Sequence, residues 1–200
     1  VTANEVIYNY SGLDYPSSIH NASQGYDSNF PLTLITGESE TEFNQNSVNQ
    51  GNNYTNIELP DDLNASSIGE KSNYSFHKFE FVINESSASI TGINISWRGF
   101  GCYLFVGNCI QNSSLLYIRN ITTSTWDYVN YSFMTEGDFI TGEINTSFNN
   151  TDYTLSDYLD GSNHLHLLVE TNYSEGAIGS VSIVMVFYKN MNSIQFCYFN

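Results

Sequence analysis

The chain has 200 residues, of which 40% are hydrophobic and 15% aromatic, so it can build one packed domain and global disorder is excluded. Its 21 acidic and 5 basic residues give a net charge of −16, which disfavours nucleic acid and anionic membrane surfaces as partners. Charged residues make up only 13% of the chain, about half the usual share, and Asn, Ser and Thr supply the polarity instead.

Alternation of apolar and polar residues with a period of two runs along most of the chain and predicts β-strands. The last of these runs is apolar on both faces in its second half, as is typical of a central strand. Residues 11–75 are the least periodic part, and we expect long loops there. In chain order, the expected strands cover residues 5–10, 32–35, 55–59, 78–83, 93–97, 115–119, 125–131, 138–147, 164–169 and 178–188.

Turn residues separate these runs at 99–101, 107–108, 136–138 and 160–162, and one helical turn is expected at 155–159. About ten short strands at this spacing predict an all-β fold, a β-sandwich or jelly-roll-like (Ig-like) domain with long loops in its N-terminal half. We expect residues 13–200 to form this single domain and residues 1–12 to supply an N-terminal strand. The longest uncharged apolar stretch, 177–188, is too short to span a bilayer, so no membrane span is expected in the mature chain.

Sequons for N-glycosylation, Asn-x-Ser/Thr, are the most informative motif. Ser and Thr make up 41 of 200 residues, so chance would place about five of the 26 asparagines in sequons. Thirteen asparagines lie in sequons, and none has Pro at the middle position. We therefore expect a secreted, cell-surface glycoprotein whose glycans supply solubility. The thirteen are Asn9, Asn21, Asn53, Asn64, Asn73, Asn84, Asn94, Asn112, Asn120, Asn130, Asn145, Asn149 and Asn172.

The chain has three cysteines. Cys102 and Cys109 have a spacing that a bridged hairpin accommodates, and in an exported protein this predicts a disulfide between them. Cys197 is left over, and either a buried thiol or an intermolecular link would account for it. Zinc sites need more Cys or His at ligand spacing, so we expect no structural zinc.

Two histidines, His164 and His166, are two residues apart in a predicted strand and so lie on the same face of it. Asp157 and Asp160 come just before this strand. Such a group could hold a metal, although its spacing does not match a calcium-binding EF-hand loop. A solvent-facing strand that follows a polar turn explains the same pattern. We favour this second interpretation and expect no metal and no cofactor.

No sequence motif indicates an enzyme: the chain has no nucleophile elbow, P-loop, dinucleotide-binding glycine pattern or HExxH zinc motif. A glycoside hydrolase site built from two carboxylates stays an open alternative, since two of the 21 acidic residues could always meet in space. Trp97, Trp126 and the 15 tyrosines could form a platform that stacks on sugars. Both tryptophans lie in strand-like runs, so we expect them to be core aromatics and the protein not to be an enzyme.

Three segments, 90–99 with its Trp97-Arg-Gly99 end, 116–129 with Asn120 and Trp126, and 158–169, resemble β-sandwich modules of archaeal cell-surface proteins. The resemblance covers roughly residues 88–190. The sequon-dense composition is also similar to exported glycoproteins of thermophilic archaea, which include thread-like filaments whose subunits each donate an N-terminal strand to the next. The resemblance implies a structural subunit of an extracellular, pilus-like filament, with copies of itself as partners.

The N-terminal run suits such a donated strand, because it is rich in β-branched and aromatic residues and a hinge-like Gly12 and Pro16 follow it. The alternative is an ordinary first strand that pairs within its own sandwich. A different function also stays open: a secreted carbohydrate-binding or adhesive module, or a surface-layer component. The residues expected to form the donated strand are Glu5, Val6, Ile7, Tyr8, Asn9 and Tyr10.

Overall fold

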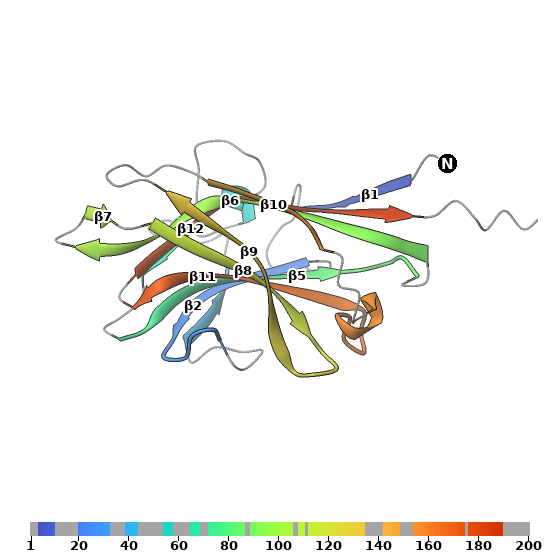
Figure 1. The fold of residues 1–200 in the computed structure, drawn as a ribbon, viewed down its shortest axis with the longest axis horizontal. Coiled ribbons are helices and arrows are strands. Elements are labelled where there is room, and N and C mark those ends of the chain that lie inside the picture. The colour runs from blue at the N-terminus through green and yellow to red at the C-terminus, as the bar shows by residue number, and fades with distance from the viewer. Residues whose placement is uncertain are drawn as a thin grey trace, which may run out of the picture.

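A computed structural model describes residues 4–10, 20–32, 39–43, 54–57, 65–68, 72–86, 89–105, 108–110, 112–134, 142–148, 154–174 and 176–189. Twelve strands in these residues form two six-stranded antiparallel sheets, which pack as two layers (Figure 1). The β-sandwich that the strand spacing predicted is confirmed, with twelve strands where about ten were expected.

The first sheet is built around β12, which pairs with β6 along one side and with β1 and β4 along the other. This agrees with the central position predicted from its two-sided apolar sequence. The strands of this sheet are β1 (Asn4–Tyr8), β12 (Gly176–Lys189), β6 (Ile90–Phe105) and β10 (Gly142–Phe148) in that order, with β4 (Ala65–Ile68) on β12 and β7 (Asn108–Ile110) on β6.

The second sheet has β5 and β11 at its centre and β3 and β9 at its edges. One face packs against the first sheet, and the opposite face, here called the outer face, carries the side chains discussed below. Its strands, in spatial order, are β3 (Ser39–Glu42), β2 (His20–Asp27), β5 (Tyr74–Val82), β11 (His164–Ser174), β8 (Asn112–Asn120) and β9 (Thr125–Met134).

The core lies between the two sheets and is built from alternate residues of the predicted strands. Phe79 and Phe81 of β5 and Leu165 and Leu167 of β11 are fully buried against the first sheet. Trp97 of β6 is also fully buried, so the expectation that it is a core aromatic is confirmed.

A small polar network crosses this apolar core. The Oγ atom of Ser180 on β12 accepts a hydrogen bond from Trp97 Nε1 at 2.8 Å and lies 2.8 Å from His77 Nδ1 on β5. All three residues are fully buried, and burial lowers the pKa of His77 to about 3, so its ring is uncharged at neutral pH. Since β5 belongs to the second sheet and β6 and β12 to the first, Ser180 ties the two layers together.

Two predicted elements are wrong. The first part of the strand expected at 55–59 is instead a 3₁₀ helix, η1 (Tyr54–Ile57), and residues 58–59 lie outside the described residues. Tyr54 and Ile57 lie three residues apart and are both buried on one side of this helical turn. The turn expected at 99–101 is part of the uninterrupted strand β6, where Gly99 pairs with Ser180 and Gly101 with Ile178. Ladder pairing on a central strand overrides the local preference of these glycines.

Several elements lie where the sequence suggested loops: β2, β3 and β4 all fall within residues 11–75. Leu32 is buried but belongs to no strand, and the rest of the strand expected at 32–35 lies outside the described residues. The helical turn expected at 155–159 is the 3₁₀ helix η3 (Leu155–Asp157), and the turn at 160–162 is confirmed. No helix in the described ranges is long and apolar enough to cross a bilayer.

The N-terminal strand β1 pairs with β12 of the same chain, with Asn4 opposite Lys189 and Tyr8 opposite Met185. Tyr10, which follows β1, is fully buried in this chain's core and donates from its hydroxyl to the carbonyl oxygen of Asn21 at 2.6 Å. This is the pairing within one sandwich that the sequence left open, and donation to a neighbouring subunit stays a prediction.

The register of the β6–β7 hairpin places Cys109 opposite Leu104, two residues along from Cys102. The two cysteines therefore belong to adjacent paired strands, and the 102–109 disulfide stays a prediction. Cys197 lies outside the described residues.

Candidate functional site

The outer face of the second sheet carries an unusual mixture of polar and aromatic side chains. Strand alternation on β5 sends Phe79 and Phe81 into the core and leaves Phe76, Lys78 and Glu80 on the outer face. Along this face, acidic side chains gather over β2, β3 and β5, two histidines of β11 lie beside them, and aromatic side chains gather over β8 and β9.

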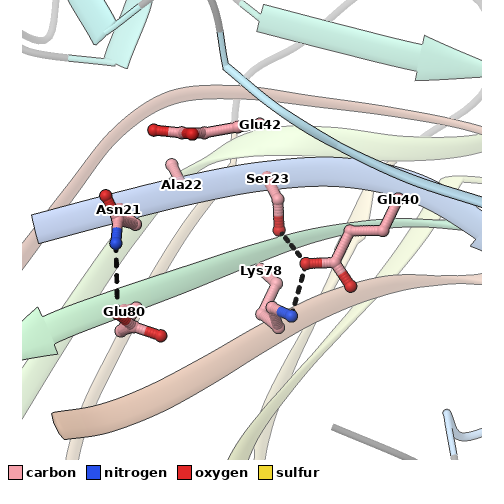
Figure 2. A pocket seen from close by; sticks show the side chains of 7 residues that line it. All are labelled: Asn21, Ala22, Ser23, Glu40, Glu42, Lys78 and Glu80. Atoms are coloured by element: carbon pink, nitrogen blue, oxygen red, sulfur yellow. Dashed lines mark hydrogen bonds and ion pairs between the residues drawn. The ribbon is translucent and has the colours of Figure 1, made fainter. Parts of the chain in front are cut away.

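A pocket of about 350 Å³ opens over β2, β3 and β5 and is here called the acidic pocket. Figure 2 shows Ser23 and Lys78 converging on Glu40: Ser23 Oγ donates to Glu40 Oε1 at 2.6 Å, and Lys78 forms an ion pair with the same carboxylate. The residues that line the acidic pocket are Asn21, Ala22, Ser23, Glu40, Glu42, Lys78 and Glu80.

Two further carboxylates of the acidic pocket have partners of their own. Asn21 Nδ2 donates to Glu80 Oε1 at 3.2 Å, and the hydroxyl of Tyr54 donates to Glu42 Oε1 at 2.9 Å. In Figure 2, Glu42 lies on the opposite side of β2 from Glu40 and Glu80. Three carboxylates and one ammonium group therefore line a single pocket.

A glycine allows β3 to approach β2 closely enough to form the acidic pocket. A Cβ atom at Gly25 would lie 1.7 Å from the carbonyl oxygen of Ser39 and 2.8 Å from Cζ of Phe76. Any side chain at position 25 would thus push β3 away from β2. Because Gly25 pairs with Glu40, this close approach also positions the carboxylate that holds Lys78.

Beside the acidic pocket, two histidines of β11 lie between two carboxylates. His164 Nδ1 is 3.2 Å from Glu80 Oε1 and 3.8 Å from Asp160 Oδ2. The ring of His166 has Nδ1 3.4 Å from Glu80 Oε2 and Nε2 3.3 Å from Asp160 Oδ2. Only 4% of His166 is exposed, and burial lowers its pKa although both carboxylates oppose this shift.

Asp160 is held in place by the turn that precedes β11. Its Oδ1 accepts from the backbone N–H groups of Ser162 at 2.8 Å and His164 at 2.9 Å. These two backbone hydrogen bonds and the His166 contact lower the pKa of Asp160 against the opposing effect of burial. A fixed aspartate thus faces β11 at the end of the strand.

The structure brings together three of the four residues that the sequence analysis grouped. Asp157 lies apart and instead accepts from Thr154 N at 2.7 Å and Thr122 Oγ1 at 2.8 Å. His166 is buried, so the expectation of a solvent-facing strand is wrong for this residue. Sequence reasoning missed Glu80, which only the β5–β11 register places opposite His166. Among the described residues, no three His, Cys, Asp or Glu side chains are placed to hold a metal ion.

Four aromatic side chains, here called the aromatic strip, lie over β8 and β9: Tyr117, Trp126, Tyr128 and Tyr131. Tyr117 and Trp126 are buried in an apolar cluster on the outer face, and the Tyr117 ring meets Tyr128 edge-on at 5.9 Å. Tyr131 pairs with Leu115, which packs against the same cluster. Tyr128 is 50% exposed and Tyr131 49%, so the strip has a buried base and an open top.

Two ionisable side chains, Arg119 and Glu170, border the aromatic strip. The guanidinium of Arg119 lies 5.4 Å from the centre of the Trp126 ring, within the range of cation–π attraction. The carboxyl of Glu170 on β11 is fully buried beside the cluster, where burial, with Asp27 adding to it, raises its pKa to about 9. Its Oε2 accepts from the Leu32 backbone N–H at 3.4 Å, whereas its Oε1 has no hydrogen-bond partner among the described residues.

The thirteen sequons lie in different surroundings. Asn84 and Asn172 are exposed, whereas Asn21 lines the acidic pocket. Asn120 is fully buried, and its Nδ2, the atom that would carry a glycan, donates to Asp127 at 3.1 Å, so this sequon suits glycosylation poorly. Asn9, Asn73, Asn94 and Asn130 are half-buried, Asn112 and Asn145 lie in β8 and β10, and Asn53, Asn64 and Asn149 lie outside the described residues.

Comparison with known proteins gives one family match. A family model described as "Uncharacterized protein, C-terminal domain" matches residues 20–185. No curated protein matches this chain. A solved structure, the family 11 carbohydrate-binding module of the cellulosomal cellulase Lic26A-Cel5E of Clostridium thermocellum, shares 12% identity over 95% of this chain and 90% of that one, with a TM-score of 0.30. At that score the likeness adds nothing to what the strand pairing shows.

Proposed function

We propose that this chain, which belongs to the AF_1625_C family of uncharacterized C-terminal domains, is a glycan-binding module of an exported glycoprotein. The outer face of the second sheet is its ligand face. The observation that carries the proposal is the aromatic strip, in which Tyr128 and Tyr131 are half-exposed above the buried Tyr117 and Trp126.

Aromatic side chains of this kind combine an apolar ring with a polar tip, and a ligand that is both apolar and rich in hydroxyl groups can use both. The ring faces can stack on the C–H faces of sugars, while the acidic pocket offers hydrogen-bonding groups on the same sheet. A few polar groups beside aromatic walls is the usual composition of a ligand site. The two exposed tyrosines also lose little conformational entropy when a ligand orders them, because each side chain has only two torsions.

The size of the face favours an oligosaccharide over a single sugar. The acidic pocket lies over β2 and β5 and the aromatic strip over β8 and β9, so β11 separates them. Four steps between neighbouring strands from β2 to β9 span about 19 Å. A ligand that contacts both parts must therefore be a chain of several sugar residues.

The test is a double variant, Tyr128→Ala with Tyr131→Ala, titrated with the neutral oligosaccharide that binds best on a glycan array. We expect affinity to fall at least about tenfold, because aromatic anchors dominate binding energy. Both side chains are half-exposed, so stability should change little. The matched control is Ile7→Ala, which removes a 60% exposed apolar side chain from the first sheet and should leave affinity unchanged.

Unchanged affinity in the double variant would show that the aromatic strip is not the ligand face. Absence of binding to any glycan on the array would remove the proposed function altogether. Export and N-glycosylation of the native protein, which the thirteen sequons support, are tested separately by glycopeptide mass spectrometry.

A second function, a filament subunit that polymerises by strand donation, is supported by the position of β1. This strand lies at the edge of the first sheet, has β12 as its one partner strand among the described residues, with five residue pairs, and exposes 60% of Ile7. An edge strand held by one neighbour can pair with the β12 of another copy through the same main-chain hydrogen bonds.

Deletion of residues 1–7 tests this function and spares Tyr8 and Tyr10, which are buried in the core. We expect the full-length protein to form fibres in negatively stained electron micrographs and the truncated protein to stay monomeric and compact in size-exclusion chromatography. The control Ile7→Ala keeps the main-chain pairing and should still polymerise. Fibres of the truncated protein would rule out donation of this strand.

A further inference from the structure

The pairing of β6 with β10 brings two glycosylation sequons side by side in the first sheet. One sequon runs from Asn94 to Ser96 in β6, and the other runs from Asn145 to Ser147 in β10. In the antiparallel register, Asn94 lies opposite Ser147 and Asn145 lies opposite Ser96. Each asparagine is therefore paired with the serine of the other sequon. The two sequons are far apart in the chain, so only the register reveals that they are neighbours.

The β6 sequon lies on the side of the first sheet that points away from the core. Ile93 and Ile95 are buried between the two sheets, and side chains alternate along a strand. Asn94 and Ser96 therefore point outward, and both are half-buried. An outward asparagine can carry a sugar chain without displacing core side chains, which the fully buried Asn120 cannot.

The register row of Asn94 continues across the sheet to an exposed apolar side chain. Asn94 pairs with Val186 of β12, and Val186 pairs with Ile7 of β1. Ile7 is 60% exposed, whereas its neighbours Val6 and Tyr8 pack on the core. Ile7 therefore points outward, on the same face as Asn94. Two strand spacings, about 10 Å, separate the two residues, which is within reach of a chain of a few sugar residues.

We infer that Asn94 and Asn145 both carry N-glycans and that these two glycans coat the outward side of the first sheet, Ile7 included. This rests on the N-glycosylation that is part of the proposed function and does not depend on ligand binding by the aromatic strip. The two asparagines are diagonal neighbours in the ladder, about 7–8 Å apart, so two sugar chains can leave the sheet side by side.

The coat has two consequences for the molecule. Strand β10 ends the order of the described strands in this sheet, and a glycan at Asn145 hinders the pairing of a further strand there. Only 13% of the residues are charged, and sugar hydroxyls supply the solubility that charged side chains supply in most proteins. The aromatic strip lies on the opposite side of the sandwich, so this coat leaves it uncovered.

The experiment uses the full chain from its native cells and has two readouts. Glycopeptide mass spectrometry should find a glycan at both Asn94 and Asn145. Hydroxyl-radical labelling, which reports the solvent exposure of a side chain, should modify Ile7 at least about twofold less in this protein than in unglycosylated protein from a bacterial host. Asn94→Gln with Asn145→Gln, made in the native cells, should remove this protection. Asn172→Gln, which removes an exposed sequon on the second sheet, should keep it.

An unmodified peptide at Asn94 or Asn145, with Asn172 glycosylated, would overturn the inference and leave the proposed function standing. Equal labelling of Ile7 with and without the two glycans would also overturn it, because the glycans would then not cover this face. Absence of a glycan at every sequon would overturn it and would remove the glycoprotein part of the proposed function. Native and unglycosylated protein share one sequence, so the labelling comparison decides even where the double variant is unstable.

Discussion

We expect Glu170→Gln to raise the free energy of unfolding by about 3 kcal/mol at pH 7. Glu170 is fully buried, and desolvation raises the pKa of its carboxyl from 4.5 to about 9, so the folded protein keeps a proton that the unfolded chain releases. Because the folded pKa is raised, the contribution of Glu170 to stability is fully present below pH 4.5 and is lost as the pH rises toward 9. Each pH unit in this window removes about 1.4 kcal/mol.

Glutamine has the same shape, carries no charge, and keeps an oxygen for the Leu32 N–H. Urea unfolding at several pH values between 5 and 8.5 should therefore show that the difference in free energy of unfolding between variant and parent grows in favour of the variant as the pH rises. Glu5→Gln, an exposed carboxylate, is the control and should change stability by less than about 0.5 kcal/mol. A variant no more stable than the parent at pH 7 would contradict a protonated Glu170 in the folded state.

The second large effect is a loss of stability: Ser180→Ala should lower the free energy of unfolding by about 2–4 kcal/mol. The hydroxyl that it removes is the partner of Trp97 Nε1 and His77 Nδ1, each at 2.8 Å, and both groups are buried. Each of these two polar groups then lacks its partner, and alanine cannot admit water in its place.

Denaturant titration at pH 7 measures this loss, with Ser23→Ala as the matched control. Ser23 Oγ donates to Glu40 Oε1 at 2.6 Å in the lining of the acidic pocket, where water can replace the hydroxyl, so we expect a cost below about 1 kcal/mol. A Ser180→Ala cost as small as that of the control would show that the buried network does not hold the two sheets together.

Core strands could be predicted from the sequence because burial imposes a visible period of two. Phe79 and Phe81, like Ile95 and Trp97, alternate with polar residues and are buried as expected. Strand β2 could not be found this way, since its inward side chains include His20 and Ala22 and give no apolar contrast. The His20 ring is buried because Tyr8, Tyr10 and Phe81 pack against it, which a local pattern does not reveal.

The candidate site shows the same division between local and distant information. Asp160, His164 and His166 were grouped from the sequence because a turn and one strand bring them together within seven residues. Glu80 lies far away in the chain and reaches them only through the register of β5 and β11. The aromatic strip also depends on pairing, since Tyr117 and Tyr128 meet across two strands.

The register of β1 on β12 has a mechanical consequence. Asn4 lies opposite Lys189, so the two strands leave the sandwich at the same end (Figure 1). Traction applied to these two residues in opposite directions would load the antiparallel hydrogen bonds one pair after another, because those bonds run across the strands. Such a ladder unzips under low force, whereas the same five pairs loaded along the strands would resist together. Pulled from this end, β1 should peel away first, while the longer β6–β12 ladder behind it keeps the sandwich closed.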